Sequence, residues 1–227
     1  MIDIAVHVGT LAAVTIYFRR DLVAMAGGLI DIFCGRRTRE AGLAFYVVAA
    51  TVPIILAGLV AVRFDLLESV RNVRLIAWTT LGFAIVLHLS DRFGPRLRPM
   101  ESLGLRDAIV IGLAQVLALV PGTSRSGITM TAARALGFER SDAARFSMLL
   151  SIPTVMAAGT LAGLDLYQTG DSTLTANALL AAVLAFVAAI AAISLLMRWL
   201  RHAGFMPFVV YRILLGAGLL AWSYTSP

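Results

Sequence analysis

Charged residues are scarce in this sequence. They make up 14% of the chain, whereas hydrophobic residues make up 59%; a soluble domain is typically about a quarter charged and about half apolar. This balance excludes an ordinary soluble protein. Uncharged stretches cover residues 41–62, 146–164 and 172–197, and each can cross a hydrocarbon core of about 30 Å as a helix. Less ideal apolar stretches lie at 2–18, 75–90, 108–124 and 203–223.

Cysteine and carboxylates are also rare. Cys34 is the only cysteine, which excludes an internal disulfide and a cysteine-rich metal site. The chain has four glutamates, and these and all its aspartates fall in predicted loops or at the ends of spans. No carboxylate pair is therefore expected at membrane depth to hold a metal or act as a base, so any metal ligands stay unassigned. The net charge of +6 comes from arginines scattered between apolar stretches, which argues against nucleic acid as a partner.

The distribution of arginines predicts the topology, because cytoplasmic loops carry an excess of basic residues. Segments 19–40, 91–106 and 198–202 are basic and read as cytoplasmic, whereas the 165–173 loop is acidic and reads as external. Counting crossings between them leaves residues 107–133 starting and ending on the same side. We therefore predict an all-α, multi-pass membrane protein with a single domain over 1–227, about six transmembrane helices and a re-entrant helix-loop-helix hairpin at 107–135.

The middle of this hairpin carries the most informative segment, GLAQVLALVPGTSRSG at 112–127. Pro121 breaks the apolar run, and an arginine at membrane depth is costly enough to mark a functional site. Irregular backbone at that depth must be buried in protein or line a wet cavity. Arginine, hydroxyls, glycines and a following helix N-terminus together form the parts of an anion cradle. The residues concerned are Gly122, Thr123, Ser124, Arg125, Ser126 and Gly127.

A membrane-embedded phosphate site implies a lipid-linked phosphate as ligand. The segment does not match the GxxxxGK[ST] pattern of a nucleotide-binding loop. The alternative interpretation is that its small residues allow close helix packing while Arg125 reaches an interface. Gln115 can line the pocket or bond a neighbouring backbone, and Arg212, inside the last span, can join the site or extend toward the cytoplasm.

PGTSRSG preceded by GLAQ closely resembles the second signature of the undecaprenyl-diphosphate phosphatases, also called bacitracin-resistance proteins. Similar segments occur at 3–14, 17–21, 145–153 and 208–216. The resemblance implies membrane helices with two re-entrant hairpins related by an inverted repeat. It also implies hydrolysis of undecaprenyl diphosphate to the monophosphate, with a divalent cation (Mg or Ca), in the bacterial plasma (inner) membrane. This reaction recycles the lipid carrier of cell-wall synthesis, and the site is expected to open outward.

Under this resemblance, Arg125 and Ser124 are the expected catalytic residues. The expected substrate-binding residues are Gly122, Thr123, Ser126, Gly127 and Gln115. Ser124 has a hydroxyl near the arginine, but the sequence places no base beside it. The sequence is compatible with a homo-oligomer.

The sequence also departs from the family pattern. The family's earlier hairpin, with a glutamate-rich motif and an SSSGH signature, lies upstream of the segment that resembles 3–14, and nothing here matches it. Either the start codon is placed too far downstream, which we favour, or the gene encodes a shortened relative with impaired activity. The lack of an embedded base favours an alternative function, a non-hydrolytic lipid-phosphate binder or transporter with broken helices at the membrane midplane.

Overall fold

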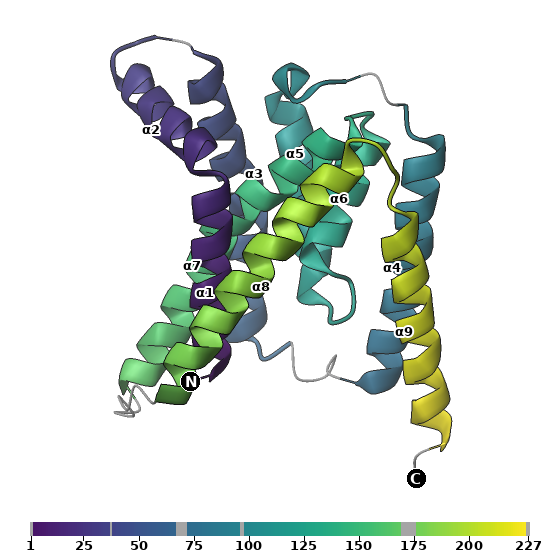
Figure 1. Cartoon of the computed structure of the whole chain (residues 1–227). Helices are drawn as coiled ribbons and strands as arrows, with labels where there is room; N and C mark the ends of the chain where they lie inside the picture. Colours follow the sequence, from purple (N-terminus) through teal and green to yellow (C-terminus); the bar gives the residue numbers. More distant parts are fainter. Residues whose placement is uncertain (1, 37, 67–71, 96–97, 169–175, 226–227) are drawn as a thin grey trace. The chain divides into compact units, whose positions relative to one another are not determined.

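The computed structural model describes residues 2–36, 38–66, 72–95, 98–168 and 176–225. Its long helices follow one another along the chain (Figure 1). They are α1 (Ile2–Tyr17), α2 (Arg19–Phe33), α3 (Arg39–Arg63), α4 (Val73–Phe93), α5 (Leu105–Val116), α6 (Arg125–Ala135), α7 (Arg140–Gln168), α8 (Ala176–Leu200) and α9 (Met206–Thr225). Two short 3-10 helices, η1 (Met100–Ser102) and η2 (Leu117–Leu119), lie beside α5 in the chain.

Four helices in the described part of the chain are long and apolar enough to cross a membrane: α3, α4, α8 and α9. Each has at least 20 residues, and 20 residues of α-helix extend about 30 Å. The all-α, multi-pass fold predicted from the sequence is therefore confirmed. The predicted spans 2–18 and 146–164 coincide with α1 and α7, which are not among these four. Most of the predicted external loop 165–173 lies outside the described residues.

The chain divides into two compact units. Unit 1 comprises residues 1–45 and 148–198, and it contains α1 and α2. The 19–40 segment, expected only as a basic cytoplasmic stretch, is mostly helix α2. Close helix approaches within unit 1 occur at glycines. A Cβ on Gly9 would lie 3.0 Å from the carbonyl carbon of Ala182, and one on Gly28 would lie 2.5 Å from that of Glu40.

Unit 2 comprises residues 46–147 and 199–227, and it contains α4, α5, α6 and α9. Here too, glycines allow helices to approach. A Cβ on Gly216 of α9 would lie 3.1 Å from the carbonyl oxygen of Ala77 in α4, and one on Gly112 of α5 would lie 2.5 Å from that of Ala50 in α3. Small residues at helix contacts are typical of membrane proteins, in which packing and not water exclusion drives association.

Within unit 2, α5 and α6 form the helix-loop-helix arrangement predicted at 107–135 (Figure 1). With 12 and 11 residues, these helices extend only about 18 Å and 16 Å. Neither can cross a hydrocarbon core of about 30 Å by itself. We refer to residues 105–135 as the hairpin and to residues 120–124 as its tip.

Candidate functional site

The tip reverses the chain direction by means of left-handed backbone conformations. Gly122 has φ +88°, and Ser124 has φ +66°. Glycine adopts such angles at little cost, but a residue with a Cβ does so at a cost of about 1–2 kcal/mol. Ser124 is also the N-cap of α6, because its hydroxyl accepts a hydrogen bond from the backbone N–H of Gly127 at 3.2 Å. The tip is thus a strained turn leading into a helix N-terminus.

Helix α4 holds the tip in place. The Thr79 hydroxyl donates to the carbonyl oxygen of Pro121 at 2.6 Å, and the Thr80 hydroxyl donates to that of Gly122 at 3.3 Å. A Cβ on Gly122 would lie 2.5 Å from the carbonyl oxygen of Ile76. Gly122 therefore meets two requirements at once, a left-handed φ and a backbone pressed directly against α4.

These contacts fix how far the tip reaches along α4. Thr79 is six residues from Val73 and fourteen from Phe93, the two ends of the helix, which corresponds to about 9 Å and about 21 Å along its axis. The predicted topology puts the Val73 end outside. In that predicted topology, the tip lies closer to the outer end of α4 than to its cytoplasmic end.

Arg125 begins α6 directly after the strained turn. Its side chain is half-buried, and its guanidinium makes no ion pair or hydrogen bond with the described residues. The carbonyl oxygens of Arg125 and Ser126 both accept hydrogen bonds of 3.1 Å from the hydroxyl of Thr129. Thr129 also shares a 2.7 Å hydrogen bond with Ser147 of α7. The first turn of α6 is thereby fixed while the Arg125 head group has no bound counter-charge in the described part of the chain.

Two further residues from the predicted site are deeply buried in the hairpin. Gln115 and Thr123 are each 1% exposed. Within the described residues, the Gln115 side-chain nitrogen and the Thr123 hydroxyl have no hydrogen-bond partner. Burying a polar group without a partner costs about 1–3 kcal/mol, so most such groups are satisfied by protein or ordered water. Each of these groups is therefore a point where water or ligand could complete the bonding.

The base of the hairpin is held by Arg98. Its guanidinium forms a two-pronged ion pair with Asp107, at 2.7 and 3.1 Å, and donates to the carbonyl oxygen of Leu136. Burial alone would raise the pKa of Asp107, but the hydrogen bonds from Arg98 and the Gly104 backbone, with the nearby positive charges, bring its pKa below the ordinary value. The carboxylate is therefore charged at neutral pH, and the start of α5 is tied to the end of α6.

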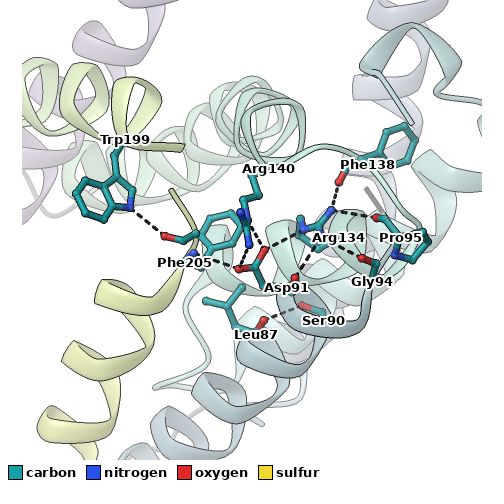
Figure 2. A network of polar contacts seen from close by, with 11 residues as sticks. Leu87, Ser90, Asp91, Gly94, Pro95, Arg134, Phe138, Arg140, Trp199 and Phe205 are labelled. Atoms are coloured by element: carbon teal, nitrogen blue, oxygen red, sulfur yellow. Dashed lines mark hydrogen bonds and ion pairs between the residues drawn. The ribbon is translucent and has the colours of Figure 1, made fainter. Parts of the chain in front are cut away.

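A second polar cluster, which the sequence analysis missed, joins the ends of four helices. Figure 2 shows Arg134 and Arg140 both directed at the carboxylate of Asp91. The distances from the Asp91 oxygens are 3.2 Å to Arg134 Nε, 2.6 Å and 2.9 Å to Arg140, and 3.3 Å to the backbone N–H of Phe205.

Arg134 is completely buried and also donates to the carbonyl oxygens of Pro95, Gly94 and Phe138. This Asp91 cluster thereby connects the end of α4, the end of α6, the start of α7 and the start of α9. Two sequence signals could have indicated this cluster: an arginine inside the apolar run TAARALGF, and an aspartate at the end of a span.

The residues around the tip do not by themselves suit a divalent cation. Magnesium and calcium prefer carboxylate and carbonyl oxygens, whereas the described side chains here are hydroxyls, an amide and guanidinium groups. In the part of the chain that the structure describes, no three His, Cys, Asp or Glu residues group together in a way that could hold a metal ion. The described donors suit an anion better than a divalent cation.

Two substitutions at Ser124 separate its capping role from a role at the ligand. Ser124→Ala keeps the left-handed φ and loses the cap, so we expect it to lower the free energy of unfolding by about 1 kcal/mol. Ser124→Gly relieves the backbone strain, so its stability should equal or exceed that of the unmodified chain. If the hydroxyl contacts ligand, both variants lose ligand affinity to a similar extent. Normal ligand affinity in Ser124→Gly would show that Ser124 acts only as a helix cap.

The sequence of this chain is similar to those of known proteins over nearly its whole length. A family model described as bacitracin resistance protein BacA matches residues 1–218. The chain belongs to the BacA family. This BacA-family chain is 50% identical over 226 residues to "Undecaprenyl-diphosphatase 1" of Rhodospirillum rubrum, covering 100% of this chain and 80% of that protein.

Other relatives give the same result. The chain is 47% identical to an undecaprenyl-diphosphatase of Roseobacter denitrificans and to one of Hahella chejuensis, covering in each case 99% of this chain and 84% of the relative. The resemblance inferred from the PGTSRSG segment is thereby confirmed as family membership. The family match includes the entire hairpin, all of α4 and the part of α9 up to residue 218, which carries the tip contact of Arg212.

Proposed function

We propose that this chain is a phosphatase that hydrolyses undecaprenyl diphosphate to undecaprenyl monophosphate and inorganic phosphate. Relatives named undecaprenyl-diphosphatase match nearly its whole length, and its apolar helices suit an enzyme whose substrate resides in the membrane. The bacterial inner membrane is the proposed location. Recycling of the lipid carrier for cell-wall synthesis, and with it bacitracin resistance, is the proposed role.

The observation that carries this proposal is the guanidinium of Arg125 at the start of α6, which has no ion pair or hydrogen bond with any described residue. A helix N-terminus attracts anions because its first backbone N–H groups have no partners inside the helix. Arginine adds a planar fork of donors that matches a phosphate group. A diphosphate placed there would meet a fixed positive charge and backbone donors whose geometry is already set by Ser124 and Thr129.

The chemistry proposed for this site is charge stabilisation. Phosphoryl transfer depends mostly on positioning and on neutralising the negative charge that spreads over the phosphate oxygens. Arg125 is the residue proposed to supply this charge. Gly122, Thr123, Ser126, Gly127 and Gln115 are proposed to line the substrate head group. No aspartate, glutamate or histidine of the described chain makes a hydrogen bond to the Ser124 hydroxyl, so we assign Ser124 to the site and not to a base-activated attack.

Arg125→Ala tests the proposal. Removing one preorganised donor from a catalytic anion site costs about 100- to 1000-fold in rate, so we expect phosphate release from undecaprenyl diphosphate to fall by that factor. The measurement is inorganic phosphate release by the purified chain in detergent, with and without added divalent cation.

Arg92→Ala is the matched control, because Arg92 is an exposed arginine on α4 whose guanidinium lies 6.0 Å from the Phe93 ring and not at the hairpin. Equal rates in Arg125→Ala and the unmodified chain would reject the assignment of Arg125. Lipid diphosphate binding without any phosphate release, under all cation conditions, would reject hydrolysis in favour of a binding protein.

A further inference from the structure

Arg212 of α9 contacts the hairpin tip through its guanidinium. Its Nη2 donates to the carbonyl oxygen of Gly122 at 2.8 Å and to that of Thr80 in α4 at 3.4 Å. The guanidinium therefore lies where α4, α9 and the tip meet. Of the two readings that the sequence left open for Arg212, the structure favours a place at the site over extension toward the cytoplasm.

Among the described residues, the Nε and Nη1 atoms of this guanidinium have no hydrogen-bond partner. The Nε atom of Arg212 is buried and makes no hydrogen bond with the described residues. Its Nη1 lies 3.6 Å from the position that a Cβ on Gly127 would occupy. Gly127 is the third residue of α6, so this edge of the guanidinium lies over the first helical turn, next to the N-terminus that Arg125 begins.

A buried positive charge without a counter-charge is costly and is normally paired. No carboxylate of the described chain forms an ion pair with Arg212. The hydroxyl of Thr123, between Gly122 and Ser124 in the tip, is likewise buried and has no partner in the part of the chain that the structure describes. An arginine and a hydroxyl that have no full set of partners among the described residues, beside the first turn of α6, together describe a site that an anion would complete.

We propose that Arg212 is a second guanidinium of the diphosphate site, holding the tip with its Nη2 and donating to substrate phosphate with its Nη1 beside the first turn of α6. This inference rests on the proposed function. Arg125 and Arg212 would then approach the head group from two different helices, α6 and α9. A diphosphate has two phosphate groups and several negative charges, so two guanidinium charges match it better than one.

Arg212→Gln and Arg212→Lys test this role. Glutamine keeps an amide that can donate to the Gly122 carbonyl but removes the charge, whereas lysine keeps the charge but loses the planar fork. We expect the thermal unfolding midpoints of both variants to stay close to that of the unmodified chain. Losing a charge-assisted hydrogen bond should raise KM and the dissociation constant for undecaprenyl diphosphate about 10- to 100-fold in Arg212→Gln, with a smaller increase in Arg212→Lys.

A purely structural role would not move the dissociation constant in a variant of normal stability. Unchanged binding in Arg212→Gln, beside weakened binding in Arg125→Ala, would therefore overturn the assignment of Arg212 and leave the proposed function intact. Weakened binding in Arg212→Gln that equals the loss in Arg92→Ala would overturn it too. If the unmodified chain neither binds nor hydrolyses the lipid diphosphate, the proposed function fails, and the Arg212 assignment fails with it.

Discussion

Gly122→Ala is expected to lower phosphate release by about 100-fold, because a displacement of about 1 Å at a catalytic site costs about that factor. Alanine at this position must adopt φ +88°, and its Cβ would lie 2.5 Å from the carbonyl oxygen of Ile76. The tip must therefore move away from α4. This movement would weaken the hydrogen bonds from Thr79, Thr80 and Arg212 together.

Gly82→Ala is the matched control for Gly122→Ala. Gly82 is also in unit 2, on α4, but a Cβ there would have no atom within 4 Å, and alanine is the better helix former. We expect this variant to keep full activity and at least normal stability. Phosphate release by Gly122→Ala at the unmodified rate would show that the position of the tip does not control the reaction.

Asp91→Ala is expected to cause the largest loss of stability, about 3–5 kcal/mol, because it leaves a buried charge without its partner. Arg134 is 0% exposed, and Asp91 is the carboxylate that both Arg134 and Arg140 contact (Figure 2). The measurement is equilibrium unfolding in detergent with increasing denaturant.

Glu139→Ala provides the comparison, because Glu139 is an exposed carboxylate beside Arg140 in the sequence. Exposed charges of this kind contribute about 0–1 kcal/mol. If Asp91→Ala lowers the free energy of unfolding by less than about 1 kcal/mol, backbone carbonyls alone stabilise the Arg134 charge. Those of Pro95 and Phe138 are among the carbonyls that it bonds.

The hairpin was predictable because its signals are local. Pro121 and Gly122 interrupt an apolar run, Arg125 lies at an unfavourable depth, and the arginine counts of the flanking loops require both ends on one side. These features also led to the family. Residues 122–127 form one turn and one helix start, and their role in ligand binding stays a prediction.

The supports of the hairpin were not predictable, because each depends on residues far apart in the sequence. Thr79 and Arg212 are 42 and 90 residues from the tip carbonyls that they bond, and neither lies in the motif. Asp91 was interpreted only as a charge at a span end. Its pairing with Arg134 and Arg140 depends on the packing of α4 against α6. The periodicity of a single sequence does not show which helices pack against each other.

The two sets of hairpin contacts have a kinetic consequence. Arg98 and the Asp91 cluster hold one end, and Thr79, Thr80 and Arg212 hold the other. An element clamped at both ends does not behave as a gate, because opening it would break several hydrogen bonds at once. Turnover is then expected to be limited by exchange of the lipid between the bilayer and a rigid site. The rate should therefore depend on membrane fluidity and not on a closing movement of the hairpin.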